Sequence, residues 1–271
     1  MIHHQIQGAP VPALGFGTFR LQGDACREGV ADALRIGYRH VDTAQGYDNE
    51  AEVGAGIHDA GVPRAELFLV SKVRPSNFAR GVAKKSTLES LKKLGTDHVD
   101  LMLLHWPSNA VPLEEPLQDL ADLQREGAVR HVGVSNFPPT WLDRARAITT
   151  IFCDQVEYHP FLSQERLLQE ARDHDLLLTA YRPLAGGKLD DEPVLREIAD
   201  AHGKSPVQVT LRWLVQQDRV ATIPKSADPQ RRRQNFDIWD FTLSADEMAR
   251  IHALDRGERQ VNPDGAPDWE R

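Results

Sequence analysis

Cysteine is scarce in this sequence. Only Cys26 and Cys153 occur among 271 residues, far apart and outside any CxxC spacing. Neither a disulfide framework nor a cysteine-rich metal site is supported, so reduced, buried thiols and no bound metal are expected.

Long apolar runs and basic charge are also lacking. No run approaches the ~20 residues that span a bilayer, and the first residues lack a basic region followed by an apolar stretch. Lys and Arg number 32 against 40 Asp and Glu, a net charge of -8, and the only dense basic cluster is at 231–233. We therefore expect a cytoplasmic protein with neither a membrane nor a nucleic-acid partner.

The chain instead shows a regular alternation of short apolar runs and longer amphipathic stretches. With 41% hydrophobic residues it can bury a large core. Eight runs rich in β-branched residues are each followed by a helical stretch, which is typical of βα units. The predicted strands begin near Gly15, Arg39, Leu67, His98, Arg130, Phe152, Leu176 and Val220.

This alternation predicts the fold class. Ser205 and Ser244 each begin a capping-box pattern at the start of a helix. No linker or composition shift divides the chain, so we expect one α/β domain over residues 1–271, a (β/α)8 TIM barrel rather than an open doubly wound sheet. Residues 2–11 are predicted to form a hairpin that covers the bottom of the barrel.

Four ionisable side chains fall where three adjacent strands end. Asp42 and Tyr47 follow the second strand, Lys72 ends the third, and His105 follows the fourth. Catalytic groups of a barrel lie at these strand ends. Each residue alone has an ordinary structural interpretation, but the set together predicts proton transfer: Tyr47 as donor, Lys72 lowering its pKa, Asp42 holding Lys72, and His105 orienting a carbonyl or sharing the proton.

The motifs around these residues resemble those of the aldo-keto reductase family over nearly the whole chain. They are GFGTF at 15–19, GYRHVDTAQGYDNE at 37–50, LHWP at 104–107, GVSNF at 133–137, QVEYHP at 155–160 and IPKS at 223–226. The resemblance implies carbonyl reduction with a nicotinamide cofactor and a catalytic tetrad of Asp42, Tyr47, Lys72 and His105.

The same resemblance implies the cofactor site. Ser135, Asn136 and Gln155 would bind the nicotinamide carboxamide and Tyr181 would stack on the ring. Further contacts would come from Thr18, Leu184, Lys225, Ser226, Arg231, Gln234 and Asn235. Because ammonium and guanidinium groups suit a 2′-phosphate, NADPH (NADP) is the expected cofactor. The neighbouring Arg232 and Arg233 are interpreted as a solvated helix face.

Substrate contacts are expected from Phe19 and Trp106, although either aromatic ring could instead cover the barrel core. The short loops and the tail RQVNPDGAPDW at 259–269 resemble the bacterial 2,5-diketo-gluconate reductase B group of the family. This implies small hydrophilic carbonyl substrates such as 2,5-diketo-D-gluconate and methylglyoxal, and a monomer.

Two residues depart from the family pattern. Asp154 stands where Asn is usual, and Arg182 stands where Ser is usual. Arg182 leaves the pyrophosphate contact open, since a cation there, aided by Lys188, could still pair with phosphate.

Other functions are less well supported. A Rossmann dehydrogenase is disfavoured because the GFGTFR segment lacks a third glycine. A metal-dependent hydrolase is disfavoured because the eleven histidines are scattered. A non-catalytic NADPH-binding regulatory protein on the same fold remains the alternative, and turnover separates it from an enzyme.

Overall fold

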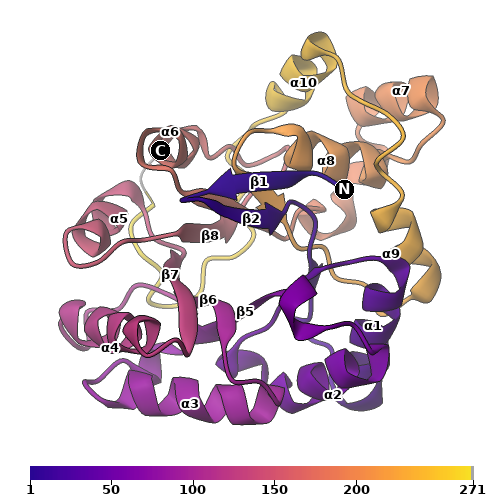
Figure 1. The fold of residues 1–271 in the computed structure, drawn as a ribbon. Coiled ribbons are helices and arrows are strands. Elements are labelled where there is room, and N and C mark those ends of the chain that lie inside the picture. Colours follow the sequence, from indigo (N-terminus) through magenta and orange to yellow (C-terminus); the bar gives the residue numbers. More distant parts are fainter. Residues whose placement is uncertain (270–271) are drawn as a thin grey trace.

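Eight parallel strands form the centre of the molecule, which we describe over residues 1–269 of a computed structural model (Figure 1). Each strand begins within one residue of its predicted start, because the apolar runs that mark them are buried on both faces. The strands are β3 (Phe16–Gly17), β4 (His40–Asp42), β5 (Phe68–Val73), β6 (Val99–Leu104), β7 (Val129–Ser135), β8 (Cys153–Glu157), β9 (Leu177–Tyr181) and β10 (Val220–Thr222).

The sheet closes on itself. The strands are paired in sequence order from β3 to β10, and a parallel bridge between Leu14 and Thr222 joins the two edges. Gly15 N donates to Thr222 O over 2.8 Å at the same seam. The predicted single-domain (β/α)8 barrel is therefore confirmed.

Helices surround the barrel, as Figure 1 shows. They are α1 (Gly23–Ile36), α2 (Glu50–Ala60), α3 (Val82–Leu94), α4 (Glu114–Arg125), α5 (Pro139–Arg146), α6 (Glu165–His174), α7 (Pro193–His202), α8 (Pro206–Gln216), α9 (Pro229–Phe236) and α10 (Ala245–His252). Short 3-10 turns are η1 (Gln45–Tyr47), η2 (Arg64–Glu66), η3 (Pro75–Asn77) and η4 (Ala185–Asp191). Both predicted capping boxes are present, at Ser205 before α8 and Ser244 before α10.

The N-terminal hairpin covers the bottom of the barrel, as predicted. It consists of β1 (His3–Ile6) and β2 (Ala9–Pro12), which pair antiparallel. Ile6 and Val11 are fully buried and pack in one cluster with Phe68, the first residue of β5, and Phe152, which directly precedes β8. The opposite end of the barrel is left for the loops that follow the strands.

Arg232 corrects one sequence interpretation. It was expected on a solvated helix face, but it is only 4% exposed. Its guanidinium pairs with Asp32 of α1 at 2.8 Å and donates to the carbonyl oxygen of Ala227 at 2.9 Å. A buried guanidinium needs such partners because desolvation of the charge is costly. Arg233, with 71% of its side chain exposed, is solvated as expected.

Both cysteines are buried free thiols. Within residues 1–269, no helix is long and apolar enough to cross a membrane.

Candidate active site

The four candidate catalytic side chains meet at the carboxyl ends of β4, β5 and β6. Asp42 is the last residue of β4, and Lys72 lies one residue before the end of β5. Tyr47 is in turn η1, directly after β4, and His105 follows β6. Because neighbouring parallel strands end at one rim, residues far apart in sequence come within contact distance.

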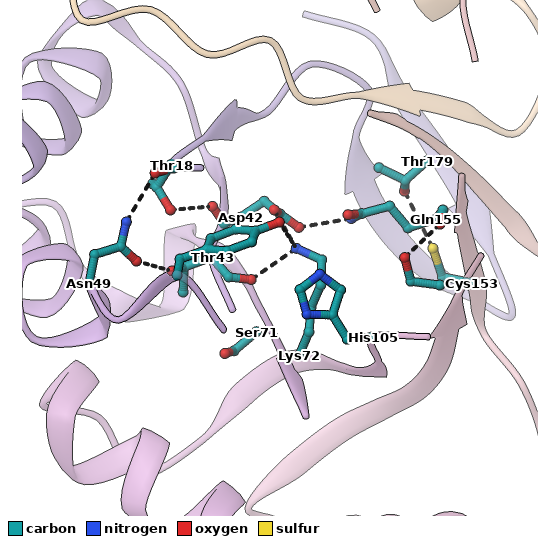
Figure 2. A network of polar contacts seen from close by, with 12 residues as sticks. Thr18, Asp42, Thr43, Asn49, Ser71, Lys72, His105, Cys153, Gln155 and Thr179 are labelled. Carbon is teal, nitrogen blue, oxygen red and sulfur yellow. Dashed lines mark hydrogen bonds and ion pairs between the residues drawn. The ribbon is translucent and has the colours of Figure 1, made fainter. Parts of the chain in front are cut away.

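Lys72 is the centre of this group. Its Nζ donates to Asp42 Oδ1 at 2.6 Å and to the carbonyl oxygen of Thr43 at 2.9 Å, and it lies 3.4 Å from Tyr47 Oη. Lys72 is fully buried and Asp42 is 1% exposed. Figure 2 shows the ammonium directed at Asp42 and Thr43, with His105 alongside. Such a buried ammonium is held charged only by close partners.

Tyr47 lies among three groups. Its ring centroid is 5.0 Å from that of Phe19 and 5.6 Å from that of His105, which meets it edge to face. Lys72 Nζ is 5.0 Å from the centroid. Burial, with a smaller contribution from Asp42, raises the pKa of Tyr47 well above its usual value. The structure thus gives the opposite direction from the lowering expected from Lys72, because removal of the phenolate from water outweighs the nearby ammonium.

His105 is held neutral. Burial first, and the positive charges of Lys72 and Arg74 next, lower the pKa of His105 to about 3. A neutral imidazole carries one N–H donor, so at neutral pH this side chain can donate a hydrogen bond without being a cation.

A second polar group is formed by residues of β7, β8 and β9 and by Asn136, which directly follows β7. Tyr181 Oη donates to Asn136 Oδ1 at 2.7 Å, and Asn136 Nδ2 donates to Ser135 Oγ at 3.0 Å. Gln155 Nε2 donates to Asp42 Oδ2 at 2.8 Å, which connects this group to the first (Figure 2). Asn136 has a positive φ of 66°, a conformation that Asn tolerates better than most residues. The loop therefore holds its amide over the strand ends.

A cavity of about 570 Å³ opens above these strand ends. Its size is that of a small-molecule or cofactor site. The residues singled out from the sequence that line it are Phe19, Asp42, Tyr47, His105, Trp106, Ser135, Asn136, Gln155, Tyr181, Leu184 and Lys225. Both aromatic residues predicted at the substrate side, Phe19 and Trp106, are thus on the cavity wall.

The remaining predicted cofactor residues lie beside or below the cavity. Lys225, exposed on the cavity wall, precedes the buried Ser226. Arg231 and Gln234 are exposed on α9 and Asn235 is buried there. Lys225 on the cavity wall and Arg231 on α9 are therefore both exposed cations.

Thr18 lies beneath the cavity rather than on its wall. Its side chain is fully buried, and its hydroxyl donates to the carbonyl oxygen of Asp42 at 2.9 Å. It supports the strand end that carries Asp42.

The two departures from the family pattern have different surroundings. Asp154 is 1% exposed, and burial raises the pKa of its carboxyl well above its usual value. Arg182 is exposed on the cavity wall in a strained backbone conformation with φ 50°. Lys188 is paired with Glu258 instead of facing the cavity.

One buried carboxylate was missed in the sequence. Glu157, at the end of β8, accepts hydrogen bonds from the backbone nitrogens of Gln260 and Val261, both at 2.8 Å. Val261 lines the cavity, so Glu157 fixes the tail as part of the wall. Its position inside the QVEYHP motif was the available signal, but its partners lie about a hundred residues away.

Comparison with known proteins decides the family. The sequence model described as the Aldo/keto reductase family matches residues 13–256. The chain belongs to the aldo/keto reductase family. It is 41% identical over 266 residues to methylglyoxal reductase DkgB of Salmonella typhi, covering 96% of this chain and 99% of that protein. It is 38% identical to morphine 6-dehydrogenase of Pseudomonas putida, covering 95% and 92%.

Solved structures agree with this assignment. A crystal structure provisionally named 2,5-diketo-D-gluconic acid reductase B superposes with a TM-score of 0.97 at 47% identity, covering 100% of this chain and 98% of that one. A Bombyx mori aldo-keto reductase, crystallised in complex with NADP, gives a TM-score of 0.91 at 32% identity, covering 99% and 97%. The chain is therefore an oxidoreductase, the enzyme class predicted from the sequence.

Proposed function

We propose that this chain reduces small aldehydes and ketones to alcohols with NADPH, with Tyr47 as the proton donor. The observation that carries the proposal is the buried Lys72–Asp42 pair at 2.6 Å, with the Tyr47 hydroxyl 3.4 Å from the same ammonium, at the bottom of an open cavity. Reduction of a carbonyl needs a hydride and a proton, and the side chains supply the proton.

The side chains around the cavity fit a nicotinamide dinucleotide phosphate. The amides of Asn136 and Gln155 and the hydroxyl of Ser135 match a carboxamide. Tyr181 offers a flat ring hydrogen-bonded to Asn136, and Lys225 lies exposed on the same cavity wall. With Arg231 on α9, Lys225 would hold the 2′-phosphate through charge-assisted hydrogen bonds. We further assign Leu184, Ser226, Gln234 and Asn235 to this cofactor. When bound, NADPH supplies the hydride.

Gln155 and Asn136 are already aligned by hydrogen bonds. Gln155 donates to Asp42, which directs the amide nitrogen inward and leaves its carbonyl oxygen for the cofactor carboxamide. Asn136 is fixed by Tyr181 and Ser135. Pre-ordered groups of this kind reduce the entropy lost on binding.

Arg182 and the cofactor pyrophosphate form the next proposed contact. The guanidinium lies exposed on the cavity wall near Leu184. Lys188 is engaged by Glu258, so Arg182 is the cation of this loop that we assign to the pyrophosphate.

The proton is donated by Tyr47. Because burial raises its pKa, the phenol is fully protonated at neutral pH, as an acid must be. As the proton leaves, the Lys72 ammonium stabilises the phenolate, and Asp42 keeps that ammonium charged and aligned. His105, held neutral, donates an N–H to the carbonyl oxygen and orients it. Neutrality favours this role over transfer of its own proton.

The substrate side of the cavity favours small, hydrophilic carbonyl compounds. Phe19, which is 49% exposed, and Trp106 both line the cavity, so two aromatic side chains border the proposed substrate side. We propose methylglyoxal and 2,5-diketo-D-gluconate as representatives of the class. The names of the methylglyoxal and diketo-gluconic acid reductase relatives support this choice.

The test is NADPH consumption by the purified protein with methylglyoxal, 2,5-diketo-D-gluconate and an aromatic aldehyde. Tyr47→Phe should lower kcat by about 100-fold or more, the scale of general acid catalysis, and should retain NADPH binding. Tyr158→Phe is the matched control, because it removes a buried hydroxyl that bonds Gln217 at 2.7 Å outside the cavity.

Each result has a clear meaning. Turnover in the parent that persists in Tyr47→Phe would refute Tyr47 as the acid. NADPH binding without turnover of any carbonyl would favour the alternative, a non-catalytic regulatory protein. We also propose one domain over residues 1–271 and a cytoplasmic monomer, and gel filtration of the same preparation tests the oligomeric state.

A further inference from the structure

The turn that carries Tyr47 is held in place by hydrogen bonds from residues that do not belong to the proposed catalytic tetrad. Tyr47 ends the short turn η1, and Asp48 follows it with φ 51°, the left-handed conformation that closes the turn. A turn of three residues has few hydrogen bonds of its own, so contacts to neighbouring elements decide where its side chains point.

Arg74 makes three hydrogen bonds to this turn and to Asp48. Its Nη2 donates to Asp48 Oδ1 at 2.7 Å and also to the carbonyl oxygen of Gln45. The backbone nitrogen of Arg74 donates to Gln45 Oε1 at 3.2 Å. One residue thus binds the turn on both sides of Tyr47.

Arg74 is also tied to Lys72 by sequence. Strand β5 ends at Val73, so Arg74 is the first residue beyond the strand that carries Lys72. The hydroxyl of Tyr47 lies 3.4 Å from Lys72 Nζ, at the outer limit of a hydrogen bond. A shift of the turn by a fraction of an ångström would break that contact. Arg74 therefore connects the two parts of the molecule whose separation matters most.

Gln45 supports the same connection from below. It is 5% exposed, and its Nε2 donates to Ser90 Oγ of α3 at 3.1 Å. Its Oε1 accepts from Asn77 of η3 at 2.9 Å as well as from Arg74. The first residue of the turn is thereby fixed to the elements that follow β5.

The charge of Arg74 reaches the site as well. It contributes, after burial and Lys72, to the lowered pKa of His105. Arg74 does not line the cavity, and none of its contacts involves a proposed cofactor residue. An effect on catalysis would therefore pass through the turn and through its charge.

We propose that Arg74 is a positioning residue that fixes the Tyr47 turn to strand β5 and so sets the distance between the Tyr47 hydroxyl and Lys72. This inference rests on the proposed function, in which that distance governs proton donation. It predicts that kcat depends on Arg74 although no substrate or cofactor touches it.

The test compares Arg74→Met with the parent in steady-state kinetics. We expect kcat to fall by about 10- to 100-fold, the scale of a small misplacement of a reacting group. The KM for methylglyoxal should stay within about twofold because the cavity wall is unchanged. NADPH affinity, measured by quenching of tryptophan fluorescence, should equal that of the parent.

The pH profile separates positioning from simple damage. With the ammonium farther away, the Tyr47 phenolate loses stabilisation, so the alkaline limb of the kcat profile should move to higher pH. A loss of folded enzyme would lower kcat at every pH without moving the limb. Arg74→Lys keeps the charge but cannot donate two aligned hydrogen bonds, so it should restore activity only in part.

Arg80→Met is the matched control. Arg80 is half-exposed in the turn before α3, and it pairs with Asp119 of α4 at 3.4 Å; neither residue lines the cavity. It should keep the kcat, the KM and the alkaline limb of the parent.

Asp48→Asn keeps the test decisive if Arg74→Met does not fold. Its carboxylate is 74% exposed, and the change removes only the ion pair with Arg74. It should lower kcat in the same direction by a smaller factor.

The inference would be overturned if the alkaline limb of the kcat profile of Arg74→Met stays where it is in the parent, whether kcat is parental or lower. If Arg74→Met does not fold, a parental kcat in Asp48→Asn would overturn the inference. If the parent enzyme reduces no carbonyl compound, the proposed function is refuted, and this inference is refuted with it.

Discussion

Gln155 donates its amide hydrogen to Asp42 over 2.8 Å, which joins the proposed nicotinamide site to the proposed proton donor system. Gln155→Leu would remove this bond and leave the buried acceptor Asp42 Oδ2 without that donor, while Lys72 still pairs with Oδ1. We expect weaker NADPH binding together with a lower kcat, each by about tenfold, the factor that corresponds to 1.4 kcal/mol. Fluorescence titration and steady-state kinetics measure the two effects.

The control for Gln155→Leu is Gln169→Leu, an exposed glutamine on α6. It should match the parent in both measurements. A Gln155→Leu enzyme with weak NADPH binding but parental kcat at saturation would show that the bond to Asp42 does not matter for chemistry.

Asp154→Asn should stabilise the protein. The carboxyl of Asp154 is buried, its Oδ1 is 3.5 Å from the backbone nitrogen of Phe137, and among the described residues its Oδ2 has no hydrogen-bond partner. Its pKa is raised in the folded state, so the folded protein binds more protons than the unfolded chain above the usual carboxyl pKa of about 3.9. The stability of the parent therefore falls as pH rises toward the folded pKa.

Asparagine does not ionise, so the advantage of Asp154→Asn should grow with pH. The limit is about 1.4 kcal/mol for each pH unit. Urea unfolding at about pH 5 and about pH 8 measures it. An equal difference at both pH values would contradict the ionisation argument.

The sequence predicted the barrel because apolar runs define its strands. Every residue of β6, VDLMLL, is buried, so its sequence is a nearly continuous apolar run that differs from the amphipathic helical stretches. The same regularity located Asp42, Lys72 and His105, since the end of a strand is a position that the pattern itself defines.

The features that the sequence did not predict depend on contacts between segments that are far apart in the chain. Arg232 was expected in solvent, but its partner Asp32 lies 200 residues earlier on α1. The direction of the Tyr47 pKa was wrong because burial, which no local pattern reports, outweighs the adjacent Lys72. The role of Glu157 in holding the C-terminal tail depends on its hydrogen bond to the backbone of Gln260, which the local sequence does not indicate.

Acid should destabilise the protein through its buried histidines. Burial lowers the pKa of His40, which is 1% exposed at the bottom of the barrel and contacts the carbonyl oxygen of Pro12 at 3.1 Å. A lowered folded pKa means that the unfolded chain binds more protons below its own pKa of about 6.5. This contribution is complete above about pH 6.5 and is lost as pH falls toward the folded pKa.

His40→Asn tests the point, because Asn keeps a donor for Pro12 but does not titrate. The free energy of unfolding of the variant should fall less steeply with acid than that of the parent, by up to about 1.4 kcal/mol per pH unit. Parallel curves between about pH 6.5 and pH 5 would assign the acid sensitivity to other groups.

Lys225 and Arg231 should set the preference for NADPH over NADH. Both side chains are exposed, Lys225 on the cavity wall and Arg231 on α9 outside it, and both are proposed to bind the 2′-phosphate. Replacing both by Ala should lower the NADPH to NADH ratio of kcat/KM by about 10- to 100-fold, since charge-assisted hydrogen bonds contribute about 1.5–3 kcal/mol. Arg233→Ala, whose side chain is 71% exposed, is the control. An unchanged ratio in the double variant would sink the phosphate assignment.

Arg182 should contribute to affinity for both cofactors equally, because the pyrophosphate is common to NADPH and NADH. Its guanidinium lines the cavity, and it is held with φ 50°. Arg182→Ser should raise the Kd of NADPH and of NADH by the same factor, about tenfold, and should leave the NADPH to NADH ratio unchanged. Titration at two salt concentrations adds a second check, since loss of a cation–phosphate contact reduces the salt dependence of binding. Equal affinity in variant and parent would show that the exposed Arg182 takes no part in cofactor binding.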